Sequence, residues 1–169
     1  LDSVTYRYAG KKFTINDYIN TFKVAGLIVV KDDKIFYENY NFGNDETTKW
    51  MSFSVTKSVT SMLIGAAIKD GFIKSVNDPV STYVTDLNRG NYSNVSIEDV
   101  LQMSSGIDWN EDYADANSDV NIASAFNDTK LYNYLNKLEV SNKPGTKFNY
   151  NTWLLYTSPS PRDSLASRM

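Results

Sequence analysis

Alternating hydrophobic and polar positions dominate the first fifty residues, which predicts short strands with one helix among them. Two β-rich runs, 26–30 and 35–40, flank the polar turn 31–34, and this pattern predicts a β-hairpin. Thr14 precedes the acidic residue Asp17 by three positions, which is typical of a helix N-terminus, and the predicted helix fades near Asn20.

From residue 53 the hydrophobic period lengthens from two to about three and a half residues, which predicts the longest helix of the chain. Its apolar stripe consists of Val55, Val59, Met62, Leu63, Ala66 and Ala67. Asp70 and Gly71 follow the stripe, and glycine at this place is a common helix stop.

Shorter helices are predicted further along the chain. Pro79 after Asn77 and Asp78 predicts a short helix through Tyr83, and Ser96 with Asp99 predicts another as far as Met103. Two more helical pieces are expected at 120–126 and 129–138, and the turn cluster 142–146 leads into an extended 147–150. The acidic stretch 108–119 is interpreted as a solvated loop.

The apolar period is lost near the end of the chain, where 156–164 is rich in serine and proline. We therefore predict an α+β chain with antiparallel strands in 1–52, a mainly helical domain in 53–152 and a disordered tail in 153–169. Because the chain begins at Leu1 and shows no leader, we expect it to be a piece of a longer product.

The amino-acid composition excludes several classes of partner and catalytic site. The 169 residues carry 17 basic and 20 acidic side chains, a net charge of −3, which argues against nucleic-acid or anionic-membrane partners. No window approaches the roughly twenty apolar residues of a membrane span, so we expect a soluble protein, although the compartment stays open. With no histidine and no cysteine, Ser-His-Asp and Cys-His nucleophiles, thiolate metal sites and disulfides are excluded.

The remaining nucleophile pattern is serine with lysine, at Ser54-Val55-Thr56-Lys57. Ser54 stands where the helical period begins, at the positive end of the helix dipole, and Lys57 shares its face one turn later. A desolvated lysine loses affinity for its proton, so Lys57 could accept the proton of Ser54. The alternative is that Ser54 is a helix cap and Lys57 is solvated, in a non-catalytic binding module or degenerate fragment.

Several segments in order make the enzyme interpretation more specific. The stretch 51–61, then 70–73 and 77–80, then 96–107 and 143–152, resembles the serine β-lactamase and penicillin-binding-protein superfamily in its class C-like branch. Asp108 to Tyr113 is most similar to the 6-aminohexanoate-dimer hydrolases and related esterases within it. The resemblance implies a β-lactamase/transpeptidase-like fold and a small amide or ester substrate, and it implies no metal or organic cofactor.

The resemblance also implies roles for individual residues. Ser54 would be the nucleophile, with its N–H in the oxyanion hole, and Lys57 and Tyr150 would move its proton. Asn151 and Thr152 would contact substrate. Without the resemblance, Tyr150 reads as an aromatic packed in the core.

The sequence departs from the superfamily's pattern in two places. The superfamily's β-lactamases usually carry Tyr-x-Asn, whereas Thr152 stands at the third position here, which argues against a β-lactam substrate. A β-lactamase or D-alanyl-D-alanine carboxypeptidase is therefore kept only as the alternative enzyme. A third motif, Lys or His followed by Thr or Ser and Gly, is not found after Tyr150, so we expect the chain itself to be inactive.

Overall fold

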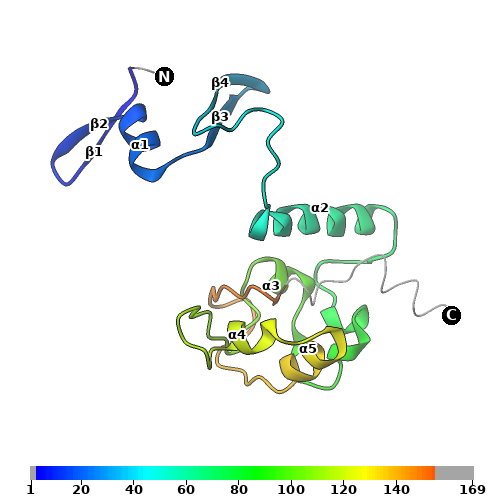
Figure 1. The fold of residues 1–169 in the computed structure, drawn as a ribbon. Coiled ribbons are helices and arrows are strands. Elements are labelled where there is room, and N and C mark those ends of the chain that lie inside the picture. Colours follow the sequence, from blue (N-terminus) through cyan, green and yellow to red (C-terminus); the bar gives the residue numbers. More distant parts are fainter. Residues whose placement is uncertain (1–2, 155–169) are drawn as a thin grey trace. The chain divides into compact units, whose positions relative to one another are not determined.

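The computed structural model describes residues 3–154 and divides into two compact units, Leu1–Met51 and Ser52–Met169 (Figure 1). The last fifteen residues of the predicted tail, 155–169, lie outside the described residues.

The first unit consists of two antiparallel hairpins with one helix between them. Its elements are β1 (Thr5–Tyr8), β2 (Lys11–Thr14), α1 (Ile15–Phe22), β3 (Gly26–Lys31) and β4 (Lys34–Tyr40). Each hairpin is its own two-stranded sheet, β1 with β2 and β3 with β4. The hairpin and the helix predicted here are confirmed, and the sequence pattern had not resolved β1 from β2.

Local chemistry explains both predicted elements of this unit. The Thr14 hydroxyl accepts a hydrogen bond from the Asp17 N–H, and the Asp17 carboxylate accepts one from the Thr14 N–H. This capping box fixes the N-terminus of α1. The β3–β4 turn places Asp32 and Asp33 at φ values of 50° and 58°. Two left-handed residues make the turn whose twist matches a hairpin.

The second unit is a set of short helices around one hydrophobic core. Its elements are the 3₁₀ turns η1 (Phe53–Val55), η2 (Val80–Thr82), η3 (Thr85–Leu87) and η4 (Asn91–Asn94) and the helices α2 (Thr56–Lys69), α3 (Ile97–Leu101), α4 (Asp119–Ser124) and α5 (Asp128–Leu135). No helix within residues 3–154 has the length and apolar character that a membrane crossing requires.

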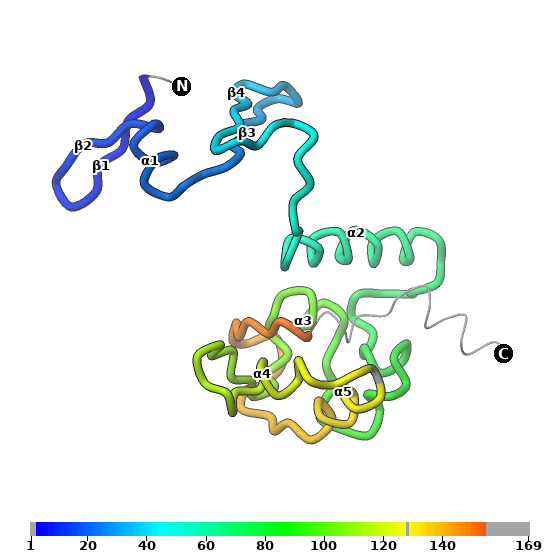
Figure 2. Tube along the Cα trace, in the orientation of Figure 1, coloured from blue at the N-terminus to red at the C-terminus, as the bar shows by residue number. Residues whose placement is uncertain are grey.

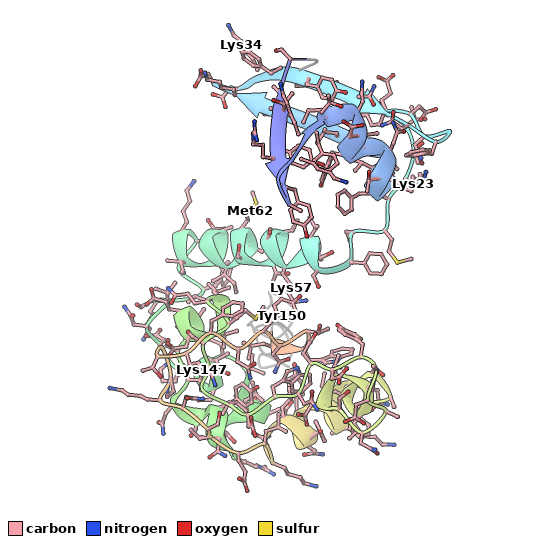
Figure 3. The ribbon with its side chains drawn as sticks, turned by 90° about the vertical axis from the view of Figure 1, so that its left-hand side faces the viewer. Lys23, Lys34, Lys57, Met62, Lys147 and Tyr150 are labelled. Carbon is pink, nitrogen blue, oxygen red and sulfur yellow. The ribbon has the colours of Figure 1, made fainter. Side chains whose placement is uncertain are left out.

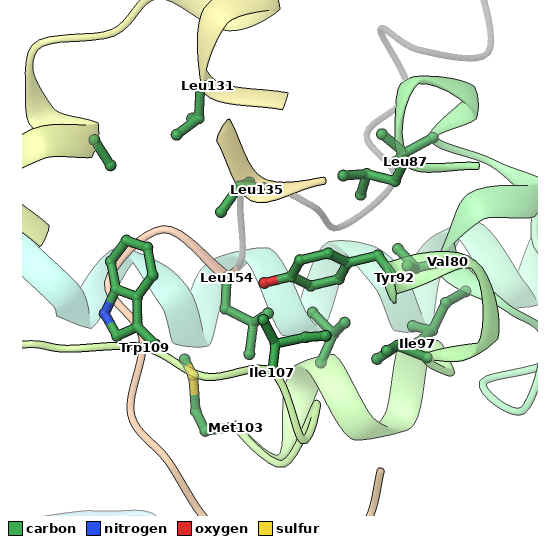
Figure 4. Packing of buried hydrophobic residues seen from close by; sticks show 14 of the residues in the cluster. Val80, Leu87, Tyr92, Ile97, Met103, Ile107, Trp109, Leu131, Leu135 and Leu154 are labelled. Carbon is green, nitrogen blue, oxygen red and sulfur yellow. The ribbon is translucent and has the colours of Figure 1, made fainter. Parts of the chain in front are cut away.

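The core of this unit is assembled from side chains of many short segments rather than from one long element. Tyr92, Leu87, Val80 and Ile97 are fully buried, and α5 contributes the fully buried Leu135 to the same cluster (Figure 4). Ile64 is the buried residue of α2. Burial of this apolar surface is the main favourable contribution to folding of the unit.

The longest predicted helix forms, but most of its apolar stripe stays outside the core, although Ala67 of that stripe packs against it. Met62 is 73% exposed, and Val55, Val59 and Leu63 are also exposed, whereas Ile64 on the opposite side is 2% exposed. Hydrophobic period therefore located the helix correctly and did not identify the face that packs in the described structure.

Other elements differ from the sequence prediction in kind or extent. The piece after Pro79 is a single 3₁₀ turn, and the helices predicted to end at 103, 126 and 138 end at Leu101, Ser124 and Leu135. The stretch 147–150, predicted as extended, belongs to no helix or strand. Trp153 and Leu154, which had been assigned to the tail, pack with the core instead, and Leu154 is fully buried. Apolar side chains at these two positions account for the difference, because burying them removes their surface from water.

Candidate active site

Ser54 lies in the 3₁₀ turn η1, immediately before the first residue of α2. Ser54 therefore stands at the N-terminus of α2, at the positive end of the helix dipole, which favours negative charge. The preceding residue, Phe53, has φ of 42°, a left-handed conformation that is unusual for a residue with a side chain. Such strain costs about 1–3 kcal/mol and is frequent at functional sites.

Lys57 lies one turn after Ser54 on the same face of the chain. Its Nζ donates a hydrogen bond of 3.1 Å to Ser54 Oγ. Lys57 is half-buried whereas Ser54 is exposed. The spacing of three positions is therefore sufficient to bring the two side chains together, as the sequence predicted.

Tyr150 reaches the same oxygen atom from a distant part of the chain. Its hydroxyl donates to Ser54 Oγ over 2.8 Å, although the two residues are 96 positions apart. Lys57 Nζ also lies 5.5 Å from the centre of the Tyr150 ring (Figure 3). The structure thus brings Ser54, Lys57 and Tyr150 together around one hydroxyl oxygen, and two donors aimed at that oxygen stabilise negative charge developing on it.

Backbone hydrogen bonds carry Tyr150 to this position. Backbone hydrogen bonds join the segment 103–108 to the segment 139–149, each with a length of 2.8 Å. Asp108 N donates to Glu139 O, Gly145 N donates to Ser104 O, and Asn149 N donates to Met103 O. Figure 2 shows the orange end of this stretch beside α3. The segment after α3, which includes Ser104-Ser105-Gly106, therefore holds the chain that leads to Tyr150.

Gly106 is central to this pairing. Its carbonyl accepts from both Ser141 N and Asn142 N, at 2.9 and 3.0 Å. A Cβ at Gly106 would lie 2.1 Å from the carbonyl oxygen of Asn142, and its φ is +75°. Only glycine fits such a close backbone approach in the left-handed conformation.

Asn151 and Thr152 are engaged with the protein itself. Asn151 is buried, and its Oδ1 accepts from Trp153 N over 2.8 Å. Thr152 N donates to Glu111 Oε2 over 3.0 Å, and its hydroxyl donates to Glu111 Oε1. Their predicted contact with substrate stays a prediction.

The loop before α4 contributes a carboxylate that sequence reasoning missed. Trp109 is 6% exposed and Glu111 is half-buried, so the interpretation of 108–119 as a solvated loop is wrong at these positions. Burial by itself raises the pKa of Glu111, but hydrogen bonds from Thr152, Trp109 and Tyr113 outweigh it and hold the pKa below its ordinary value. The signal available in the sequence was the alternation Trp109-x-Glu111-x-Tyr113, which places polar groups beside a large apolar one.

Comparison with known proteins gives consistent matches. The Beta-lactamase family matches residues 18–155. A 6-aminohexanoate-dimer hydrolase of Paenarthrobacter ureafaciens is 34% identical over 94 residues, which is 56% of this chain and 24% of that relative. The chain therefore spans about a quarter of the length of this curated relative.

Solved structures agree on the fold. The structure named "Putative 6-aminohexanoate-dimer hydrolase from Bacillus anthracis" has a TM-score of 0.72 at 19% identity, covering 92% of this chain and 44% of that one. A second, named "Crystal structure of putative beta-lactamase from Bacteroides dorei DSM 17855", has a TM-score of 0.58 at 19% identity, covering 86% of this chain and 45% of that one. The predicted α+β, β-lactamase-like fold is thus confirmed, and the chain belongs to the Beta-lactamase family of serine hydrolases.

Proposed function

We propose that this chain carries the nucleophile of a serine hydrolase that cleaves small linear amides or esters through an acyl-enzyme on Ser54. One observation carries the proposal: Ser54 Oγ accepts hydrogen bonds from both Lys57 Nζ and Tyr150 OH. A nucleophile within hydrogen-bond distance of proton-accepting side chains is the arrangement that covalent catalysis requires.

The proposed reaction has two stages. Ser54 Oγ attacks the carbonyl carbon and forms a new C–O bond, while its proton passes to the Lys57–Tyr150 pair. The pair returns that proton to the leaving nitrogen or oxygen as its bond to the carbonyl carbon breaks. Water then attacks the acyl-enzyme and gives its proton to the pair; cleavage of the acyl–Ser54 bond releases the carboxylic acid, and Ser54 regains its hydroxyl proton.

Lys57 and Tyr150 act together in this proposal. Each lies within hydrogen-bond distance of the Ser54 oxygen, and the lysine Nζ lies 5.5 Å from the centre of the tyrosine ring. Because both side chains reach the same oxygen atom, the proposal assigns the transfer of the Ser54 proton to the pair. The Ser54 N–H supplies one donor to the oxyanion that forms during attack.

The names of similar proteins support a substrate class for this proposal. A relative with 34% identity is named a 6-aminohexanoate-dimer hydrolase, and that name describes a linear amide substrate. Thr152 stands where the β-lactamases of the superfamily usually have asparagine, and its hydroxyl is engaged by Glu111. We therefore favour a linear amide or ester over a β-lactam ring.

We further propose that this chain by itself forms a covalent adduct but turns over substrate poorly. Turnover requires substrate-binding groups and a second oxyanion donor in addition to the nucleophile. The 94 residues that match the curated relative are 24% of it, so most of that relative's length has no counterpart in the match.

The experiment is labelling with a fluorophosphonate, in which Ser54 Oγ displaces fluoride from phosphorus. We expect one adduct by intact mass, mapped to Ser54, and no adduct in Ser54→Ala. Lys57→Ala should slow labelling about a hundredfold or more, because it removes one member of the pair that takes up the Ser54 proton. Ser61→Ala is the matched control, since Ser61 lies in the same helix and donates to Ser58 O.

Labelling at Ser61 or Ser58 instead of Ser54, or equal labelling of wild type and Lys57→Ala, would refute the proposal. The substrate class is tested by trapping acyl adducts of a short p-nitrophenyl ester and of a chromogenic cephalosporin. We expect a Ser54-dependent adduct to form faster from the ester, and faster acylation by the cephalosporin would favour the β-lactamase alternative.

A further inference from the structure

Tyr150 lies in a segment without regular secondary structure, so its position depends on side-chain contacts as well as backbone pairing. Before Tyr150, Asn149 is held by its N–H on Met103 O and by its amide Nδ2 on Trp109 O at 3.3 Å. After Tyr150, the contacts converge on one carboxylate. The position of the phenol is therefore controlled from both sides.

That carboxylate belongs to Glu111, and both of its oxygens are used. Oε2 accepts from Thr152 N at 3.0 Å and from Trp109 Nε1 at 2.5 Å. Oε1 accepts from Tyr113 OH at 2.9 Å and from the Thr152 hydroxyl. An ionised carboxylate is an acceptor at every lone pair, so it can hold four donors at once, whereas a neutral amide cannot.

The loop that carries Glu111 is itself anchored. Asn110 N donates to Asp119 Oδ2 at 2.7 Å, and Val120 N donates to Asn110 O, which joins the loop to the start of α4. Asp119 also accepts from the Tyr134 hydroxyl of α5. Glu111 therefore links a rigid part of the helical unit to the segment two residues beyond Tyr150.

We propose that Glu111 is a positioning residue, which holds Thr152 and thereby sets Tyr150 OH at hydrogen-bond distance from Ser54 Oγ. The inference rests on the proposed function, because it assigns Glu111 to the Ser54 reaction. Glu111 acts through Tyr150 and does not touch the reacting atoms. A small displacement of a positioned catalytic group can lower a rate about a hundredfold.

The test is the fluorophosphonate labelling rate of the 169-residue chain in a double-mutant cycle. Glu111→Gln keeps the shape and removes the charge, and we expect it to slow Ser54 labelling about tenfold or more. In the Tyr150→Phe background the same change should alter the rate less than about twofold, because the hydroxyl that Glu111 positions is absent. A general loss of structure would slow labelling in both backgrounds alike.

The matched control is Glu98→Gln, the same chemical change at an exposed glutamate of α3. In the described contacts its carboxylate accepts only from the side-chain amide of Gln102, the residue that follows α3. It should label at the wild-type rate. Glu111→Asp, which restores the charge on a shorter side chain, should recover part of the rate lost in Glu111→Gln, and circular dichroism should show both variants folded.

The outcomes separate the two proposals. If the unchanged chain labels at Ser54 and Glu111→Gln labels at the same rate, or loses the same factor with and without the Tyr150 hydroxyl, the positioning role is overturned and the proposed function stands. If the unchanged chain does not label at Ser54, both are overturned.

Discussion

Gly106 provides the most direct test of how the fold holds the site. It has φ of +75°, and a Cβ there would meet the Asn142 carbonyl oxygen at 2.1 Å. The substitution Gly106→Ala therefore has two effects. It imposes a left-handed conformation on alanine, and it forces the Ser141–Asn142 backbone away from the Gly106 carbonyl to which both donate.

The loss of stability in Gly106→Ala is the sum of three contributions. Alanine at a left-handed position costs about 1 kcal/mol relative to glycine. Inserting a methyl group against fixed backbone costs about 1–3 kcal/mol, and each weakened hydrogen bond about 1 kcal/mol. We expect Gly106→Ala to lower the free energy of unfolding of this unit by about 3–5 kcal/mol.

Gly71→Ala isolates the conformational contribution. Gly71 has φ of +80° and a Cβ there would have no atom within 4 Å. It should lose only about 1 kcal/mol. Urea unfolding followed by tryptophan fluorescence, to which the buried Trp109 contributes, measures both losses. The reasoning is refuted if the two variants differ by less than about 0.5 kcal/mol.

Three further predictions concern the same unit. Ser96→Ala removes the hydroxyl that accepts from the Asp99 N–H and should cost about 1 kcal/mol of stability in urea unfolding. Ile64→Ala should cost about 2–4 kcal/mol, whereas Leu63→Ala should stay within about 0.5 kcal/mol, because Ile64 is 2% and Leu63 53% exposed; equal losses would contradict the described packing. The lowered pKa of Glu111 means that its stabilisation is present above the ordinary value of 4.5 and is lost as the pH falls through the folded-state pKa. The difference in urea midpoint between wild type and Glu111→Gln should therefore shrink between neutral pH and about pH 3, and a difference that grows on acidification would contradict this sign.

Tyr113 and Thr152 are the polar groups that face this carboxylate together with the Trp109 indole. The pKa of Tyr113 is raised, because its hydrogen bond to Glu111 and its burial outweigh the opposing hydrogen bond with Thr152. Tyr113 therefore keeps its proton as a donor over the pH range of that experiment, and protonation of Glu111 itself is the change that the measurement follows.

Short-range features were predictable because their causes are short-range. The capping boxes Thr14–Asp17 and Ser96–Asp99 form within three positions, and both appear in the structure as expected. The hairpin around Asp32 and Asp33 likewise depends on its own turn. The family's ordered segments allowed the fold to be predicted, and the Beta-lactamase match over 18–155 confirms it.

The sequence by itself therefore determined the two capping boxes, the β3–β4 hairpin, the position of α2 and the family. It also determined the pairing of Ser54 with Lys57, because side chains three positions apart lie on the same face of a helical turn. The family resemblance implied that Tyr150 works with Ser54, but the hydrogen bond that joins them across 96 positions, and the contact of Glu111 with Thr152, come from the tertiary structure alone. It also decided which side of α2 packs, and that Trp153 and Leu154 join the core. These contacts form between segments that lie far apart in the sequence. The hydrophobic period of one segment does not tell which other segment packs against it.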